Sequence, residues 1–284
     1  MSLTFEPFAN AVEYLNVNAQ IVSRWFERMK HEGERRFERL LDLASGAGTM
    51  VQLMFDYLPK DWHKPLITCV DRSVEALELT RQRLVPKLTE KLECLCTGVE
   101  QLSIKKQSAD VVTFGNGIHY LDLKSQNEVM ERVHYSLKPG GWFFFNTAFY
   151  KEARPEWTLP FYQKKVRLAV QKLGERSVTR DKLERRPTSA DFLPRQHYED
   201  LVTRNGFELD DMTEIEARLG QKAWEMISGY SQYAAGALHG FPVEEAANAL
   251  QEAIAPALAE YGRIDENGSR YISRNWLAVA ARPV

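Results

Sequence analysis

Short apolar runs alternate with segments of helical periodicity between residues 39 and 149, and this alternation limits the fold more than any other feature. Runs typical of buried strands cover 39–44, 66–71, 92–96, 109–114 and 142–149, and helical patterns cover 50–58, 74–84 and 123–137. Strands that are joined through helices pair in parallel. Later strand patterns at 207–215 and 276–281 complete the set. We therefore expect an α/β fold, doubly wound, with a mostly parallel seven-stranded sheet.

The segments that flank this alternation predict further helices. Residues 12–29 carry apolar side chains every three or four positions, which is typical of an amphipathic helix. Additional helical patterns lie near 160–173, 196–205, 221–238 and 242–261. We expect Pro86 to limit the helix that begins at Val74, with Ser73 as its N-cap, and Pro256 to split or kink the last helix.

Charge and cysteine content exclude several classes of protein. The formal net charge of −2 argues against extended binding to nucleic acid, which favours a strong basic excess. The sequence predicts no membrane span and no secretory signal, and we expect a cytoplasmic protein. Cys94 and Cys96 alternate within an apolar run and are expected to be core thiols, and no Cys or His spacing predicts a metal site.

A glycine-rich turn follows the first predicted strand, and a helix begins directly after it. Gly46 and Gly48 let the backbone approach a ligand closely, and a helix N-terminus offers free N–H groups. Asp71 ends the next strand, 25 positions after Gly46, where an acid can accept hydrogen bonds from both hydroxyls of a ribose. A dinucleotide-binding turn would have a third glycine at position 51, where this chain has Val51, and this disfavours a nicotinamide cofactor.

Four ordered blocks within residues 40–149 resemble the class I S-adenosylmethionine-dependent methyltransferases, in particular the small-molecule group. They are Leu41-Asp42-Leu43-Ala44-Ser45-Gly46-Ala47-Gly48, Val70-Asp71, Ala109-Asp110-Val111-Val112 with His119-Tyr120-Leu121, and Leu137-Lys138-Pro139-Gly140-Gly141. The resemblance implies the Rossmann-like methyltransferase fold and S-adenosyl-L-methionine as cofactor. It implies one methyltransferase domain over 1–284, with an N-terminal helical lid (1–38), a cofactor-binding half (39–149), and cap insertions over the acceptor site (150–195 and 216–270).

The resemblance also implies a set of cofactor-binding residues: Asp42, Ala44, Ser45, Gly46, Gly48, Asp71, Arg72, Gly98, Val99, Glu100, Gly115 and Asn116. One position departs from the family, which often has an Asp at the end of the third strand that accepts from the adenine amino group. This chain has Gly98 there. The Val99 N–H can still donate to the adenine ring, and we expect Glu100 to be a helix-start residue favoured by the helix dipole rather than an adenine ligand.

His119, just past the fourth strand, is the candidate catalytic residue, as a base or as a group that orients the acceptor. The alternative is a structural histidine packed under the cap. Methyl transfer from a sulfonium needs little acid–base help unless the acceptor must lose a proton. The candidate acceptor-binding residues are Tyr14, His119, Tyr120, Tyr150 and Trp157.

The acceptor is expected to be a small or medium-sized, partly apolar molecule of the secondary metabolite, lipid or quinone type, because the added segments are rich in aromatic residues. Residues 164–186 hold nine Lys or Arg against three acids. A solvated lid face is the preferred interpretation of this basic run, and an anionic substrate or a carrier protein is the alternative. The competing functions are a catalytically silent S-adenosylmethionine-binding regulator or partner subunit and a nicotinamide-dependent oxidoreductase.

Overall fold

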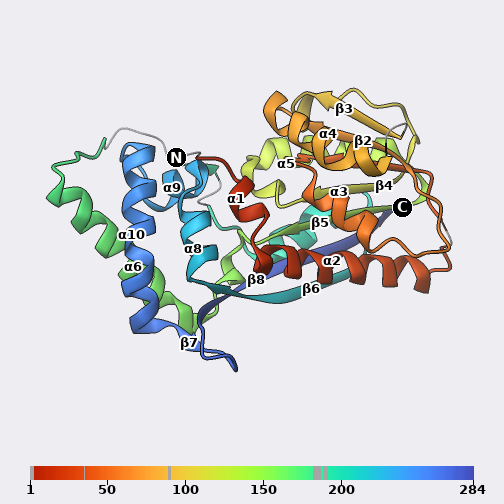
Figure 1. The fold of residues 1–284 in the computed structure, drawn as a ribbon. Helices are drawn as coiled ribbons and strands as arrows, with labels where there is room; N and C mark the ends of the chain where they lie inside the picture. Colours follow the sequence, from red (N-terminus) through yellow and green to blue (C-terminus); the bar gives the residue numbers. More distant parts are fainter. Residues whose placement is uncertain (1–2, 35, 89–90, 182–186, 189–190) are drawn as a thin grey trace. The chain divides into compact units, whose positions relative to one another are not determined.

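The computed structural model describes residues 3–34, 36–88, 91–181, 187–188 and 191–284, and the chain divides into two compact units (Figure 1). Unit 1 comprises residues 1–17, 151–192 and 216–275, and unit 2 comprises residues 18–150, 193–215 and 276–284. The predicted cap ranges, 150–195 and 216–270, fall mostly in unit 1, and the predicted lid, 1–38, is divided between the two units. That the cap covers an acceptor site stays a prediction.

A mostly parallel sheet runs through unit 2. Its order is β3 (Leu92–Cys96), β2 (Leu66–Asp71), β1 (Arg39–Leu43), β4 (Ala109–Gly115), β5 (Leu137–Thr147), β8 (Arg270–Pro283) and β6 (Phe207–Gly220), and the short β7 (Arg263–Ile264) pairs with β8. Strands β1 to β5 pair in parallel, whereas β8 runs antiparallel to β5. The predicted doubly wound α/β fold is confirmed.

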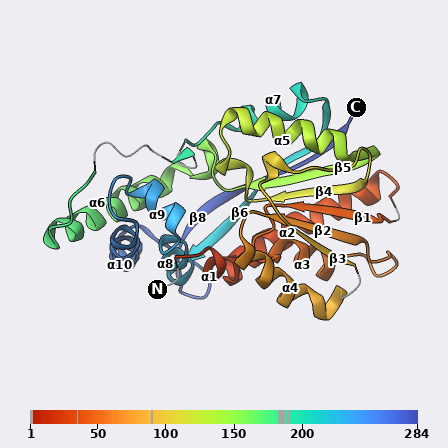
Figure 2. The same cartoon turned by 90° about the horizontal axis from the view of Figure 1, so that it is seen from above.

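Helices cover both faces of this sheet, as Figure 2 shows. Helices α2 (Val12–His31, of which unit 2 holds residues 18–31), α3 (Thr49–Asp56) and α4 (Val74–Leu88) lie on one face, and α5 (Leu123–Ser136) and α7 (Arg195–Arg204) lie on the other. The Trp25 ring of α2 stacks on Phe144 of β5, with ring centroids 5.0 Å apart. From Asn18 onward, α2 is therefore a layer of unit 2 that packs on the sheet.

The strand register brings the ends of the parallel strands to one edge of the sheet. Asp42 of β1 lies beside Thr113 of β4, and Asp71 of β2 lies beside Cys96 of β3. Gly115 pairs with Asn146 at the ends of β4 and β5. In open α/β sheets, ligands bind outside this carboxyl edge. The fold therefore positions the glycine-rich turn and Asp71 at the expected binding edge.

Three local expectations for unit 2 were wrong. Helix α4 continues past Pro86 to Leu88, because a proline so close to the helix end removes just one backbone donor from the final turn. Cys96 is exposed and Cys94 half-buried, since β3 lies at the edge of the sheet. The strand expected over 142–149 begins at Leu137 and ends at Thr147, and the register of its pairing with β4 shifts between Ala109 and Val111.

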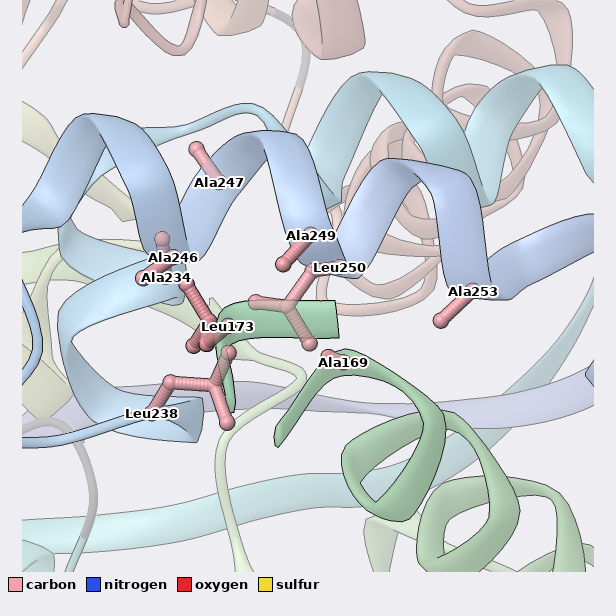
Figure 3. Close-up of a cluster of buried hydrophobic side chains, with 9 residues drawn as sticks. All are labelled: Ala169, Leu173, Ala234, Leu238, Ala246, Ala247, Ala249, Leu250 and Ala253. Atoms are coloured by element: carbon pink, nitrogen blue, oxygen red, sulfur yellow. The ribbon is translucent and has the colours of Figure 1, made fainter. Parts of the chain in front are cut away.

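Unit 1 is built from helices around an alanine-rich contact. It contains α1 (Glu6–Ala9), η3 (Lys151–Ala153), η4 (Glu156–Thr158), α6 (Leu159–Glu175), α8 (Gln221–Ser228), α9 (Ser231–Ala237) and α10 (Val243–Tyr261). Figure 3 shows Ala169 and Leu173 of α6 against α10 and α9. Small side chains such as Ala246, Ala249 and Ala253 are buried in this cluster, and they let the helix backbones approach closely.

Three sequence expectations for unit 1 differ from the structure. The expected helix 221–238 is interrupted at Gly229 and Tyr230 and forms α8 and α9, whereas α10 runs unbroken over Pro256. The basic run 164–186 is not a uniform solvated face: Lys164 and Lys172 pair with Glu260 and Glu252 of α10, at 2.5 and 3.0 Å, and Lys165 is 1% exposed. Residues 182–186 of this run lie outside the described residues.

Within the part of the chain that the structure describes, no helix combines the length and the apolar character that crossing a membrane requires.

Candidate functional site

The glycine-rich turn after β1 has three residues in the left-handed region, Ala44, Gly46 and Gly48, with φ of 50°, 54° and 75°. A side chain at Gly48 would meet Thr80 at 3.1 Å. Nothing lies within 4 Å of the position that a Cβ on Gly46 would take. The backbone at Gly46 is therefore open to the close approach of a ligand, as predicted for a glycine at this position.

Hydrogen bonds tie this turn to the end of β2. The Ser45 hydroxyl donates to the Asp42 carbonyl at 2.8 Å and accepts from the Val70 N–H at 3.1 Å. One carboxylate oxygen of Asp71 accepts from the Gly46 N–H at 2.8 Å, and the other accepts from the Ser73 N–H at 2.9 Å. The structure therefore joins the two motifs that the sequence analysis placed side by side.

Asp42 is a buried carboxylate, 1% exposed, at the end of β1. The Thr113 hydroxyl donates to its Oδ1 at 2.5 Å. Its Oδ2 is buried and has no hydrogen-bond partner among the described residues. Burial raises the pKa of Asp42 to about 6. A buried acceptor without a donor is costly in a folded protein, and a bound donor or cation would satisfy it.

The end of β3 brings Glu100 back over Gly98. Val99 and Glu100 begin the short helix η1 (Val99–Gln101), which agrees with the expected helix start. A Cβ on Gly98 would lie 2.6 Å from Glu100 Oε1. Glu100 Oε2 lies 4.0 Å from Arg72 Nη2, and it is buried with no hydrogen-bond partner among the described residues. The Glu100 carboxylate therefore occupies the space beside residue 98 that an aspartate side chain would enter.

An asparagine network holds the ends of β4 and β5. Asn116, with φ of 50°, donates its N–H to Asn146 Oδ1 at 2.8 Å, and Trp276 Nε1 donates to Asn116 Oδ1 at 3.0 Å. Asn146 Nδ2 donates to Asn18 Oδ1 of α2 at 2.8 Å. The Asn116 side chain therefore bonds the side chains of Trp276 and Asn18 in unit 2.

His119 lies in η2 (Ile118–Tyr120), directly after β4, and is 4% exposed. A 3.0 Å hydrogen bond joins its Nδ1 to Thr147 Oγ1 at the end of β5. Its ring stacks on Phe149 and lies against Tyr120, with centroids 4.2 Å away in both cases. These contacts fix the orientation of the imidazole at the carboxyl edge of the sheet.

The five predicted acceptor residues are divided between the two units. His119 and Tyr120 are in contact, and Tyr150 belongs to the same unit and is fully buried. Tyr14 packs against Phe5 and Phe8 in unit 1, with centroids 5.5 and 5.2 Å apart. Trp157 also lies in unit 1, and the Arg263 guanidinium lies 3.9 Å from the centroid of its ring. An acceptor site made from all five stays a prediction.

Sequence reasoning missed four polar residues that support this edge. Thr113 and Asn146 are polar positions inside apolar strand runs, and that isolation is the signal that could have marked them. Thr80 of α4 donates its hydroxyl to the Gly46 carbonyl at 2.7 Å, and Asn18 is a fully buried amide on α2. Neither position carries a local signal, because the partner of each lies far away in the sequence.

In the described segments, no group of three or more His, Cys, Asp or Glu side chains is arranged to hold a metal ion.

Comparisons with known proteins agree with this geometry. Residues 41–145 match a family described as a methyltransferase domain. A search of curated proteins gives no match. Among solved structures, a proposed methyltransferase from Bacillus halodurans C-125 is 13% identical, with a TM-score of 0.55 over 92% of this chain and 100% of that chain.

Two further structures show the range of chemistry on this fold. The [4+2]-cyclase SpnF is 14% identical, with a TM-score of 0.53 over 93% of this chain and 81% of its own. A geranyl diphosphate methyltransferase, solved with geranyl diphosphate and sinefungin, is 13% identical, with a TM-score of 0.50 over 92% of this chain and 78% of its own. At these identities the likeness concerns the fold alone.

The matched region, 41–145, contains residues 41–43 of β1, the glycine-rich turn after it, Asp71 at the end of β2, and β5 up to Phe145. The domain match identifies residues 41–145 as a methyltransferase domain, and the bonded pair of motifs at Gly46 and Asp71 lies within it.

Proposed function

We propose that unit 2 binds S-adenosylmethionine across the ends of β1, β2 and β3 and that the enzyme methylates a small, partly apolar acceptor. The observation that carries the proposal is the buried Oδ2 of Asp42, which has no hydrogen-bond partner among the described residues, in the strand that leads into the open turn at Gly46. An ammonium group of the cofactor's methionine part would supply the missing donor and the opposite charge. When bound, S-adenosylmethionine supplies an electrophilic methyl group on a sulfonium.

Asp71 has the acceptor capacity that a ribose needs. A carboxylate offers about four lone-pair sites, and two of them are taken by the Gly46 and Ser73 N–H groups. The remaining sites suit two adjacent hydroxyl donors. Because these two N–H bonds fix the carboxylate before a ligand arrives, the pairing costs little side-chain entropy.

Replacing Asp71 by alanine should weaken S-adenosylmethionine binding by about 1–3 kcal/mol, the range for hydrogen bonds to a charged group. Isothermal calorimetry on the purified chain measures this change. NAD, titrated into the wild-type protein as a control, should give no heat of binding. Detectable NAD binding without S-adenosylmethionine binding would overturn the proposed function, and an unchanged affinity in the variant would place the ribose elsewhere.

Glu100 supplies the carboxylate that residue 98 lacks. Its Oε1 lies where a side chain on residue 98 would begin, and its Oε2 is a buried acceptor with no hydrogen-bond donor in the described chain. An adenine amino group is a donor of the right kind for that oxygen. We therefore assign Glu100, rather than the backbone of Gly98, as the acceptor for the adenine amino group. This assignment departs from the sequence-based expectation of a helix-start role alone.

Replacing Glu100 by glutamine should weaken S-adenosylhomocysteine binding about tenfold, because a neutral amide is a poorer acceptor than a carboxylate. The double variant Gly98→Asp with Glu100→Ala moves the acid to position 98 and should restore most of the affinity. Gly98→Asp alone should not improve binding, since two carboxylates would then compete for one space. Calorimetry of all three variants would contradict the assignment if Glu100→Gln bound like the wild type.

The acceptor class rests on the aromatic residues of unit 1 and on His119. Aromatic side chains favour ligands with apolar surface. Unit 1 carries several aromatic groups, among them Tyr162, Trp224 and Tyr233. His119 is proposed as the base for an acceptor that must lose a proton, and Thr147 orients its ring. The methyltransferase of similar fold is named for geranyl diphosphate, an apolar chain that carries a diphosphate, and this supports a partly apolar acceptor here.

A further inference from the structure

One side of helix α6 is a row of buried side chains, and one of them is a lysine. Phe161, Lys165, Ala169 and Leu173 follow one another at four-residue steps, and all four are buried. Ala169 and Leu173 pack into the alanine-rich cluster with α9 and α10 (Figure 3). An apolar residue at position 165 would continue this packing. The row instead carries a lysine that is 1% exposed, although lysine is almost never fully buried unless it is paired.

The surroundings of the Lys165 amine are aromatic. Within the described chain, the Lys165 Nζ donates a hydrogen bond to the Tyr233 hydroxyl at 2.5 Å. Four ring centroids lie around Nζ: Tyr233 at 4.7 Å, Trp224 at 5.0 Å, Tyr162 at 5.4 Å and Phe161 at 5.7 Å. Aromatic faces attract a cation, but each contributes about 0.5–2 kcal/mol, far less than the hydration that a buried ammonium loses.

Two guanidinium groups share this environment. Arg274 of β8 is 4% exposed and donates to the Tyr162 hydroxyl at 3.3 Å. The Arg154 guanidinium lies 5.3 Å from the centroid of the same Tyr162 ring and 4.4 Å from that of Phe192. Arg274 also faces Phe192, with its guanidinium 5.8 Å from the ring centroid. Three basic side chains from separate parts of unit 1 therefore converge on one set of rings.

No negative charge of the described residues offsets the Lys165 amine. The charged groups that act on it are Arg274 and Arg154, and both lower its pKa, in addition to the larger effect of burial. The two tyrosines cannot serve as anions near neutral pH, because burial raises the pKa of Tyr162 to about 12 and raises that of Tyr233 as well. A buried amine beside two cations lowers the free energy of unfolding. Such a loss of stability is typical of functional sites.

We propose that Lys165, Arg154 and Arg274, with the rings of Tyr162, Trp224, Tyr233 and Phe192, form a binding site in unit 1 for an organic oxyanion, a carboxylate or a phosphate monoester, on an apolar body. An oxyanion compensates the charge, and guanidinium groups bind such anions through paired hydrogen bonds. The rings provide the apolar contact surface. That this anion is the methyl acceptor rests on the proposed function, whereas the binding site itself does not.

The test uses three naphthalene probes that carry a carboxylate, a phosphate or a neutral amide at the same ring position. We expect the wild-type chain, in calorimetry at pH 7, to bind 2-naphthoate or 2-naphthyl phosphate at least tenfold more tightly than neutral 2-naphthamide. The tighter of the two anions distinguishes a carboxylate site from a phosphate site. Absence of binding by both anions at millimolar concentration, or equal affinity for all three probes, would overturn the proposal.

Lys165→Met removes the charge and keeps the apolar length of the side chain. We expect it to weaken binding of the preferred anion at least tenfold and to leave the affinity for 2-naphthamide unchanged. Lys172→Met is the matched control, because Lys172 lies on the same helix but pairs with Glu252 at the surface, and it should bind the anion like the wild type. Equal anion binding by the wild type and Lys165→Met would overturn the proposal.

Further measurements distinguish a loss of anion binding from a folding defect and test the anion site separately from the proposed function. Lys165→Met should melt at a temperature no lower than that of the wild type, since it replaces a buried amine by an apolar group, and S-adenosylhomocysteine should bind both proteins equally. Anion binding should raise the pKa of Lys165, so calorimetry in two buffers of different ionisation enthalpy should show proton uptake by the wild type that Lys165→Met lacks. If S-adenosylhomocysteine fails to bind the wild type while the anion binds, the proposed function fails and the anion site stands.

Discussion

Replacing Asp42 by asparagine should raise the free energy of unfolding of the ligand-free protein by about 3 kcal/mol above pH 7, and it should weaken S-adenosylmethionine binding at least tenfold. The gain in stability is expected because burial raises the pKa of Asp42 from 3.8 to about 6, so the charged form is disfavoured in the folded chain. The loss of affinity is expected because asparagine offers no negative charge to a cationic ligand at the buried Oδ2 position.

The stability gain has a defined dependence on pH. Between the unfolded pKa of about 3.8 and the folded pKa of about 6, the folded chain holds the Asp42 proton and the unfolded chain has lost it. The contribution of this group to stability therefore falls as the pH rises through this window, and it is constant above it. The difference between the variant and the wild type should grow from near zero at pH 4 to its full value above pH 6.

Urea unfolding of the ligand-free proteins at pH 4, 5, 6 and 8 measures this difference. Asp56→Asn is the matched control, since Asp56 is an exposed carboxylate at the end of α3, and its substitution should change stability by less than about 0.5 kcal/mol at every pH. A variant Asp42→Asn that is less stable than the wild type at pH 8 would mean that the carboxylate is already compensated without a ligand.

Replacing His119 by alanine should lower kcat by about 10²–10⁴-fold, the usual contribution of a general base, if the acceptor loses a proton on methylation. The affinity for S-adenosylhomocysteine should stay near that of the wild type. The measurement is steady-state release of S-adenosylhomocysteine, with an acceptor found by screening small aromatic and isoprenoid carboxylates and phosphates.

A packing role for His119 predicts a different pattern. Its ring is buried against Phe149 and Tyr120, so alanine would leave a cavity and lower the free energy of unfolding. His197→Ala is the control, because His197 is a partly buried histidine of the same unit that hydrogen-bonds Gln126 at 2.7 Å, and it should keep its activity. A kcat loss below tenfold, together with a lower melting temperature, would assign His119 to packing alone.

The succession of strands and helices along the chain, most strand bounds and the pair of motifs at Gly46 and Asp71 were predictable because each depends on local pattern. Apolar runs of five or six residues predict buried strands, and Gly46 and Asp71 each stand directly after such a run. Helix breaks were predicted less well. Pro86 and Pro256 both lie within continuous helices, because tertiary packing outweighs the loss of one backbone hydrogen bond.

The sequence by itself determined the α/β class, the cofactor edge and the residues of the turn, because the period of the apolar side chains and the position of glycines are properties of neighbouring residues. Tertiary structure alone decided which polar groups meet. Thr113 reaches Asp42, and Glu100 folds back over Gly98, through contacts that no local pattern records. The same holds for the basic run, where Lys165 is buried among aromatic rings while Lys164 and Lys172 pair with acids of α10. Desolvation depends on what surrounds a side chain in space, and the sequence shows each lysine only with its neighbours in the chain.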